Sequence, residues 1–359
     1  MISRLNIEGF KGINELEIPK LSRVTLLGGR NNVGKSSILE ALFMFHDRLN
    51  PQMILRQFAW RGVSTIALNP ESIWTPVFYD YNLDRKIIIS ATVNGDEEKM
   101  TIKFNPKYVP ASIPAIVKGQ KMEAAQIRTD QKPEPSAALD IIYDSRKMKN
   151  QMAHLLIGLN GLSLQLDNVA IEGRPANFLG ARVPIDHSDE AQKFGQLDIR
   201  GELEKVVNFL RIIDPKLQSL SSVNVGAGIS LIHGNIGLSR KIPVAYMGDG
   251  VSRLLSFILA IANSKNGVVL IDECENGLHY SVMQKIWEAI AKAAHEYDCQ
   301  VVGTTHSYEC LEAAYKGISA DLREDFSYVR IDRIDNKTKA KCFDYEMLNV
   351  AIETNTEVR

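Results

Sequence analysis

Apolar and polar residues alternate along the first part of the chain. This period of two predicts strands over Ile2–Ile7 and Asn14–Ile18, joined by a turn at residues 9–12. The mostly apolar residues 24–27 predict a buried strand, and residues 37–42 have the composition of a helix. Further antiparallel strands are predicted over residues 64–68, 76–81, 86–93 and 99–104, and Asn94-Gly95 predicts a hairpin turn between the last two.

The pattern weakens in the middle of the chain. Residues 106–135 contain five of the chain's 13 prolines, which predicts an irregular projection. Residues 136–166 have helix-like spacing around 138–142 and 152–156. We therefore expect a mostly helical or irregular insertion over residues 106–174. Eight basic and five acidic residues between 107 and 150 leave nucleic-acid contact open, although a solvated surface is the commoner reason for such an excess.

Helices and strands alternate in the second half of the chain. Apolar spacing predicts an amphipathic helix over 201–213 and a strand pair over 223–233. The later elements are predicted as helices over 251–263, 281–297 and 308–315, and as strands over 267–271, 300–303 and 328–331. Such alternation favours a mainly parallel sheet. We expect an α/β fold with a mixed central sheet, in which an N-terminal lobe (residues 1–105, with an antiparallel β subdomain) and a C-terminal lobe (residues 175–359) flank the insertion.

Composition excludes several classes of protein. The 359 residues are 45% hydrophobic and 24% charged, as in ordinary globular proteins, and the net charge of −1 argues against a polycation that coats nucleic acid or membranes. The spacing of the four cysteines fits no zinc or redox motif, so reduced thiols are expected. The N-terminus lacks a signal-peptide pattern and no apolar run reaches membrane-spanning length, so we expect a cytoplasmic protein without membrane contact.

A phosphate-binding loop is the strongest chemical signal. The loop matches G-x-x-x-x-G-K-[ST] and reads Gly29-Arg30-Asn31-Asn32-Val33-Gly34-Lys35-Ser36. It stands between the strand and the helix predicted above, so its glycines and free N–H groups can cradle a phosphate chain at a helix N-terminus. Lys35 would reach the β- and γ-phosphates, and the Ser36 hydroxyl would hold Mg²⁺. A turn that binds nothing is the alternative, which this context makes remote.

Three further motifs follow at predicted loop positions. Asp272 and Glu273 end the apolar strand 267–271, where ligand sites of α/β sheets lie, and suit Mg²⁺ binding and general-base catalysis respectively. His306 ends the next strand and could contact a γ-phosphate, although a lone histidine is more often structural. Gly248-Asp249-Gly250 precedes an apolar helix, where it forms either a plain helix cap or an anion site.

These four motifs, in this order, resemble those of the ABC-type ATPases, specifically the RecF/SMC/OLD branch. Residues 30–37 look like its Walker A motif, residues 272–279 like its Walker B motif and D-loop, His306 like its switch histidine and residues 248–250 like its signature motif. The opening Ile7-Glu8-Gly9-Phe10-Lys11-Gly12 and the closing residues 351–359 also resemble compact bacterial ATPases encoded beside nucleases in phage-defence loci. The resemblance covers the first 45 or so residues and those from about 175 onward.

The resemblance implies a site and a mechanism. Glu273, His306 and Lys35 would be catalytic, and Ser36 and Asp272 would hold Mg²⁺. ATP would contact Lys11, Gly29, Arg30, Asn31, Asn32, Val33, Gly34, Lys35, Ser36 and Ser37, and, from a second subunit, Gly248, Asp249 and Gly250. ATP would thus join two copies head to tail, and slow hydrolysis would release them.

Two departures from the family pattern stand out. Gly248 replaces the signature serine of transporter-like members, so a γ-phosphate contact must come from backbone amides or Ser252. The glutamine that usually senses the γ-phosphate has no clear counterpart; Gln57 is a candidate, and a surface glutamine is an equal alternative.

Three functions remain open at this point. We expect an ATPase that regulates or scaffolds a separate effector, a nuclease or toxin, in bacterial antiphage defence. Only 53 residues follow His306, too few for the Toprim nuclease domain of OLD proteins, which is why the effector is expected to be separate. The alternative is a RecF-like protein that binds DNA when ATP is bound. A nucleotide sensor without hydrolysis is disfavoured by Asp272, Glu273 and His306.

Overall fold

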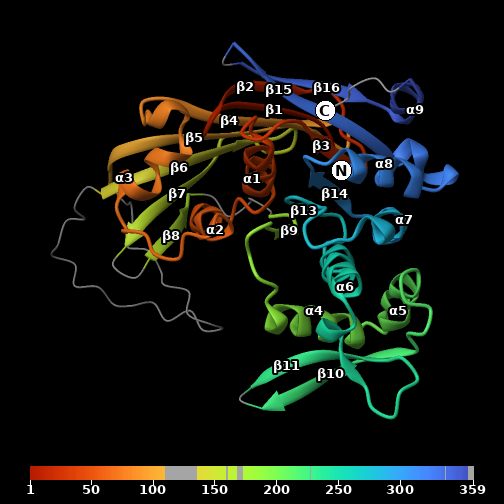
Figure 1. Cartoon of the computed structure of the whole chain (residues 1–359). Coiled ribbons are helices and arrows are strands. Elements are labelled where there is room, and N and C mark those ends of the chain that lie inside the picture. The colour runs from red at the N-terminus through yellow and green to blue at the C-terminus, as the bar shows by residue number, and fades with distance from the viewer. Residues whose placement is uncertain (110–135, 159–160, 168–172, 227, 336, 355–359) are drawn as a thin grey trace.

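A computed structural model describes residues 1–109, 136–158, 161–167, 173–226, 228–335 and 337–354. The described residues form three β-sheets with helices packed around them (Figure 1). Most of the segment predicted as an irregular projection, residues 110–135, lies outside the described residues, as do residues 355–359 of the closing motif.

The first sheet has seven antiparallel strands, which neighbour each other in the order β2-β1-β4-β5-β6-β7-β8. The predicted first hairpin is confirmed, as is the hairpin that turns at Asn94-Gly95, where Val93 pairs with Asp96. The strands are β1 (Ile2–Phe10), β2 (Ile13–Ile18), β4 (Lys86–Val93), β5 (Asp96–Tyr108), β6 (Ser136–Asp144), β7 (Gln151–Gly158) and β8 (Gly161–Leu166).

The prediction of helices over residues 136–166 was wrong, because this stretch forms β6, β7 and β8 at one side of the antiparallel sheet. β6 and β7 each bury four residues in a row, so the alternation that marks a half-exposed strand is absent. Side chains on one face join the main core, whereas Ala138 and Leu156 pack with Tyr108 in a small cluster. A continuous apolar run cannot be told from a buried helix by periodicity alone.

Two other predicted strands were also wrong. Residues 63–67 have no regular structure, and residues 75–81 form two short 3-10 helices, η1 (Thr75–Val77) and η2 (Tyr79–Tyr81). A Pro at the second position of η1 favours a helical turn rather than a strand. The short helix α3 (Pro70–Ile73), capped by the side chain of Asn69, leads into them.

The second sheet has six strands in the order β16-β15-β3-β14-β13-β9. All neighbours are parallel except β15 and β16, which form an antiparallel hairpin, so the predicted mixed central sheet is confirmed. The strands are β3 (Val24–Gly28), β9 (Ala176–Leu179), β13 (Val268–Ile271), β14 (Gln300–Thr304), β15 (Phe326–Ile334) and β16 (Lys337–Phe343).

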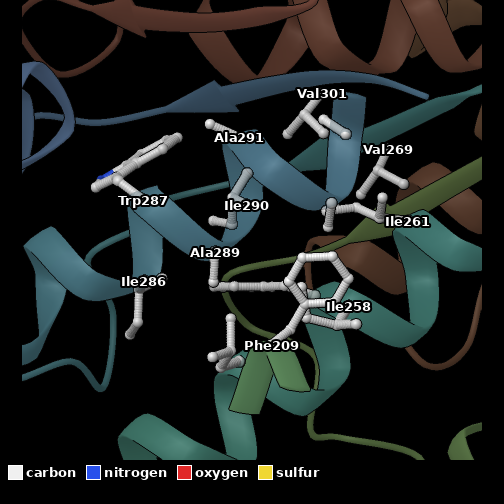
Figure 2. Close-up of a cluster of buried hydrophobic side chains, with 14 of the residues drawn as sticks. Phe209, Ile258, Ile261, Val269, Ile286, Trp287, Ala289, Ile290, Ala291 and Val301 are labelled. Carbon is white, nitrogen blue, oxygen red and sulfur yellow. The ribbon is translucent and has the colours of Figure 1, made fainter. Parts of the chain in front are cut away.

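Helices cover both faces of this mixed sheet. Val268 and Leu270 of β13 face the core that contains α1 (Lys35–His46), α2 (Met53–Trp60) and the antiparallel sheet. Val269 and Ile271 face the opposite core, which contains α6 (Asp249–Ala262), α7 (Tyr280–Glu296) and α8 (Tyr308–Gly317). Figure 2 shows side chains of α6 and α7 meeting those of β13 and β14 in that core. Strands buried on both faces read as continuous apolar runs, which is the pattern that the sequence has here.

A third group of elements lies at the end of the molecule away from the antiparallel sheet (Figure 1). It joins α4 (His187–Ile199) and α5 (Leu203–Arg211) to a small sheet of β10 (Ser219–Gly226), β11 (Ile229–Asn235) and β12 (Ile242–Pro243). The 3-10 helix η3 (Val244–Tyr246) then leads into α6. This group, called the α4–α6 lobe below, therefore presents the start of α6 at its own surface.

The remaining elements are η4 (Ala320–Asp325) and α9 (Tyr345–Glu353), which lie beside β15. Among the residues described, no helix combines the length and the apolar character needed to cross a bilayer. The division of the chain after residues 105 and 174 stays a prediction. β5 runs through Tyr108, and β6–β8 belong to the same sheet as the N-terminal strands.

Candidate nucleotide site

The P-loop lies between the end of β3 and the start of α1, as predicted. Gly34 caps α1 with φ 104°, a left-handed conformation that suits glycine. A Cβ atom on Gly29 (φ 131°) would lie 2.2 Å from the carbonyl oxygen of Ile331, so a larger residue does not fit there. The first turn of α1 has no acidic residue and no side-chain cap, which leaves its N–H groups available to an anion.

The Lys35 side chain folds back onto the loop. Its Nζ donates to the carbonyl oxygens of Gly29 (2.6 Å) and Arg30 (2.8 Å). Burial lowers the pKa of Lys35, and the nearby carboxylates of Glu275 and Asp272 act in the opposite direction. A half-buried ammonium group inside a glycine loop is well placed to exchange these carbonyl contacts for phosphate oxygens.

Asp272 lies at the carboxyl end of β13, within reach of the P-loop. Its Oδ1 accepts hydrogen bonds from the Ser36 hydroxyl (3.0 Å) and the Thr304 hydroxyl (2.7 Å). Burial raises the pKa of Asp272, and these two hydrogen bonds oppose that shift. A buried carboxylate beside a hydroxyl fits Mg²⁺, which takes one or two protein oxygens and favours the ionised carboxylate. Ser36 and Asp272, 236 positions apart in the chain, are therefore brought together as the sequence predicted.

Glu273 occupies a strained backbone position directly after Asp272. Its φ is 51°, a left-handed value that is uncommon for a residue with a side chain. The strain is held by two contacts, since Glu273 N donates to Thr304 Oγ1 (2.8 Å) and Asn276 Nδ2 donates to Glu273 Oε2 (2.6 Å). Strained residues of this kind cluster at functional sites, and here the strain aims a carboxylate next to Asp272.

His306 follows β14, the strand next to β13. Its backbone N–H donates to Glu275 Oε1 (3.0 Å), and its Nδ1 lies 3.1 Å from the same oxygen. The Glu275 side chain is 9% exposed, whereas that of His306 is 47% exposed. Since Glu275 engages Nδ1, Nε2 is the ring nitrogen left for a ligand.

These groups line one cavity of about 560 Å³. The P-loop residues 31–37 form one wall, and Asp272, Glu273, Thr304 and His306 form another. The volume is in the range of pockets that hold small ligands. The parallel strands β3, β14 and β13 are neighbours, so their carboxyl ends bring three distant parts of the sequence to one edge.

A second hollow of about 460 Å³ adjoins the first. Four residues line both hollows, namely Gly12, Ser37, Arg61 and Arg333. The second hollow is lined mainly by α2 and the η1–η2 segment, with Phe58, Val77 and Tyr79 among its apolar surfaces. Asp272 lines the first cavity and not this second hollow.

Lys11 lines this second hollow and is tied to α1 by a buried carboxylate. Its Nζ donates to Glu40 Oε2 (2.7 Å), and Arg61 makes a bidentate pair with the same carboxylate, both contacts at 2.8 Å. Burial lowers the pKa of Lys11 to about 8, against the attraction of Glu40. The predicted nucleotide contact of Lys11 is therefore geometrically possible, beside Arg61, which the motifs did not reveal.

Two family models match the chain and together span most of it. Residues 1–161 match the family described as "AAA ATPase domain", and residues 157–312 match the one described as "AAA domain, putative AbiEii toxin, Type IV TA system". An "ATP/GTP phosphatase" of Helicobacter pylori is 23% identical over 334 residues, which cover 87% of each chain. A protein of Methanocaldococcus jannaschii, described as uncharacterized, is 29% identical over 127 residues, 34% of this chain and 55% of its own.

A solved structure decides the fold. The crystal structure of an SMC head bound to the C-winged helix domain of ScpA superposes with a TM-score of 0.50 at 11% identity, covering 98% of this chain and 99% of its own. The fold is that of an ABC-type P-loop ATPase. The predicted fold class is thus confirmed, and the two family models support an ATPase-type function.

The predicted signature motif of this ATPase fold lies apart from the cavity. Gly248, Asp249 and Gly250 begin α6, and residues of this turn do not line the 560 Å³ cavity. Gly248 has φ 98°, and nothing described lies within 4 Å of a Cβ atom placed on it. Arg253 of α6 donates from Nε to the carbonyl oxygen of Asn276 (3.1 Å), the residue that also holds Glu273. The roles predicted for the signature residues stay predictions.

Gln57 does not reach the phosphate side of the ATPase site. It lies on α2 with 2% exposure, where its Nε2 donates to the carbonyl oxygen of Met53 (3.3 Å), so the alternative of a surface glutamine was wrong. Its role as a γ-phosphate sensor stays a prediction. Arg182, in the turn after β9, lines the cavity together with Asp272. Sequence reasoning missed Arg182, Glu275 and Thr304 as site residues, although Thr304 precedes His306 by two positions and its hydroxyl beside a predicted site was a usable signal.

Proposed function

We propose that the chain binds ATP with Mg²⁺ in the 560 Å³ cavity and hydrolyses it slowly. The observation that carries the proposal is the meeting of the P-loop, Asp272, Glu273 and His306 at one sheet edge. The relative described as an ATP/GTP phosphatase supports hydrolysis of a nucleoside triphosphate. Mg²⁺, held by Ser36 and Asp272, would neutralise charge on the β- and γ-phosphates.

The residues then divide the chemistry among them. Glu273, held by Asn276, accepts a proton from the attacking water, whose oxygen bonds to the γ-phosphorus while the bond to the ADP oxygen breaks. Lys35 and the N–H groups at the start of α1 hold the phosphate oxygens. His306, which Glu275 orients through Nδ1, would donate from Nε2 to the γ-phosphate with both ring nitrogens protonated.

We further propose that two copies close around ATP, with residues 248–250 of one copy against the γ-phosphate held by the other. The start of α6 supports this, since it has no side-chain cap and nothing described lies within 4 Å of a Cβ atom placed on Gly248. Asp249 lies in the same turn, so its carboxylate would have to point away from the phosphate. The dimer would regulate or scaffold a separate effector, a nuclease or toxin, in antiphage defence, in a cytoplasmic setting. The matched family described as a toxin of a type IV system supports such a setting.

Mass in solution tests the dimer. Glu273→Gln removes the base but keeps the site, so turnover should fall by about 10²–10⁴-fold while ATP still binds. With ATP and Mg²⁺ this variant should elute at twice the 40.1 kDa mass of the chain, and with ADP at the single mass. Lys35→Ala is the control and should stay monomeric with either nucleotide. A monomer in all conditions would refute the dimer, and equal turnover in wild type and Lys35→Ala would refute the site.

The gene neighbourhood tests the effector. An adjacent gene for a nuclease or toxin is expected, and its product should change activity when the ATPase carries Glu273→Gln. A neighbourhood of replication and recombination genes, with ATP-dependent and salt-sensitive DNA binding, would favour the RecF-like alternative instead.

A further inference from the structure

Arg182 lies in the tight turn that connects β9 to α4. It lines the phosphate cavity together with Asp272 and Glu273, and its side chain is exposed. Its guanidinium has no carboxylate within ion-pair distance in the part of the chain that the structure describes. An arginine stays charged at all ordinary pH values, so this turn brings a positive charge to the site without a counter-charge fixed to it.

The turn is held firmly against the catalytic edge of the sheet. β9 pairs in parallel with β13, and the N–H group of Asp272 donates to the carbonyl oxygen of Leu179 (2.9 Å). Phe178, the residue before Leu179, stacks on Trp60 with ring centroids 3.8 Å apart and planes 9° apart. Arg182 therefore follows, by three residues, the residue whose carbonyl oxygen accepts a hydrogen bond from Asp272.

The other cations of the cavity are placed differently. Arg61 is bound through two contacts to Glu40, and Lys35 belongs to the P-loop. Arg333, on β15, lines both hollows. Arg182 lines the first cavity but not the second, on the side where Asp272 and Glu273 mark the terminal phosphate.

We propose that Arg182 binds the γ-phosphate and makes the site distinguish a nucleoside triphosphate from a diphosphate. This inference rests on the proposed function, because it uses the same phosphate cavity. The guanidinium matches phosphate oxygens with two parallel N–H donors, which gives direction as well as charge. The same contact offsets the charge that spreads over the γ-phosphate oxygens during hydrolysis. Arg182 thus supplies from its own chain a γ-phosphate contact in the first cavity, whereas Gln57 lines only the second hollow.

Titration calorimetry with full-length protein and Mg²⁺ tests this, using a non-hydrolysable ATP analogue and ADP as the two ligands. Arg182→Ala should weaken binding of the analogue by roughly 10- to 100-fold, the range expected for a hydrogen bond to a charged group, and leave ADP binding within about twofold. Arg182→Lys should retain part of the preference, since it keeps the charge and loses the paired donors. Arg333→Ala is the matched control and should change the two affinities by the same factor.

The outcomes separate the two proposals. If wild type binds neither nucleotide, the proposed function fails. If wild type binds both and Arg182→Ala keeps the wild-type ratio of the two affinities, the role of Arg182 alone is refuted. An equal loss for both nucleotides also refutes it, because it would show a general contribution of charge rather than recognition of the γ-phosphate. Circular dichroism should confirm that each variant, altered at an exposed side chain, keeps the wild-type fold.

Discussion

Two helices of this protein begin at a glycine in a positive-φ conformation, and their surroundings differ. Gly34 precedes α1 with φ 104°, and Gly248 precedes α6 with φ 98°; neither helix start has a side-chain cap. A Cβ atom on Gly34 would lie 3.4 Å from Ile13 Cγ1, whereas one on Gly248 would meet nothing described within 4 Å. Both helix starts leave backbone N–H groups for an anion, but the first turn of α6 contains Asp249, whereas that of α1 has no acidic residue.

The larger difference between the two turns is what the mixed sheet places opposite each of them. The start of α1 faces the carboxyl ends of β13 and β14, which deliver Asp272, Thr304 and His306 into one cavity. The start of α6 lies at the surface of the α4–α6 lobe, and Tyr246 beside it is 81% exposed. A helix N-terminus therefore becomes a nucleotide site only where other elements supply the metal ligand and the base. We proposed above that the second turn is completed into a site by another copy, and the following experiments test that proposal.

The largest effect is expected from a carboxylate at the second turn. Gly250→Asp adds a second negative charge beside Asp249 in the first turn of α6, where the helix dipole favours a negative charge by about 0.3–1 kcal/mol. Its Cβ atom would lie 3.3 Å from Val282 Cγ2, so the Val282 side chain must shift slightly. If the turn meets the γ-phosphate of another copy, the same charge costs several kcal/mol, so turnover and ATP-dependent dimerisation should fall by about 10²-fold or more. ATP binding to the single chain should stay unchanged. The comparison between the turns fails if turnover keeps its wild-type rate, which phosphate release and light scattering measure.

A smaller effect is expected at the first turn, where Thr304 supports both carboxylates. Thr304→Val removes the hydroxyl that donates to Asp272 and accepts from the N–H group of Glu273. Leaving these buried groups unsatisfied should lower the free energy of unfolding by about 1–3 kcal/mol. Urea denaturation measures it, with Thr338→Val on β16 as the control, a buried threonine that does not itself line the cavity although it pairs with Arg333. Equal stability of Thr304→Val and Thr338→Val would show that the network beside the P-loop contributes little.

The smallest effect expected is a pH dependence of the free energy of unfolding, caused by Lys11, which contacts Glu40 of α1. The pKa of Lys11 is about 8 in the folded chain, and its ordinary value of 10.5 applies to the unfolded chain. At a pH between 8 and 10.5 the unfolded chain therefore binds more protons than the folded chain. The free energy of unfolding should therefore rise with pH, by about 1 kcal/mol between pH 7 and 9, relative to Lys11→Met. Arg253→Met on α6 is the matched control, and its free energy of unfolding should differ from that of wild type by the same amount at pH 7 and pH 9. If the free energies of unfolding of wild type and Lys11→Met differ by the same amount at both pH values, the lowered pKa of Lys11 is contradicted.

Sequence patterns predicted the catalytic edge better than the sheet around it. The P-loop and the strands before Asp272 and His306 follow from local features, namely glycines at positions that need them and apolar runs of strand length. β6 and β7 were misread because both their faces are covered at the centre of the strands, which removes the alternation. The turn after β9 carries no motif, and the four residues of β9 are all half-buried, so neither gave a local signal. Its place at the site depends on a residue 93 positions away, because the N–H group of Asp272 donates to the carbonyl oxygen of Leu179.

The sequence by itself determined that a phosphate loop exists here, because a glycine loop between a buried strand and a helix binds anions through its own backbone. It also determined which carboxylates end a buried strand. Tertiary structure alone decided that Arg182, and not Gln57, lines one cavity with Asp272, and that Glu275 contacts His306. Those pairings depend on the strand order β3-β14-β13-β9, which is set by long-range packing of two cores on opposite faces of one sheet rather than by any local pattern.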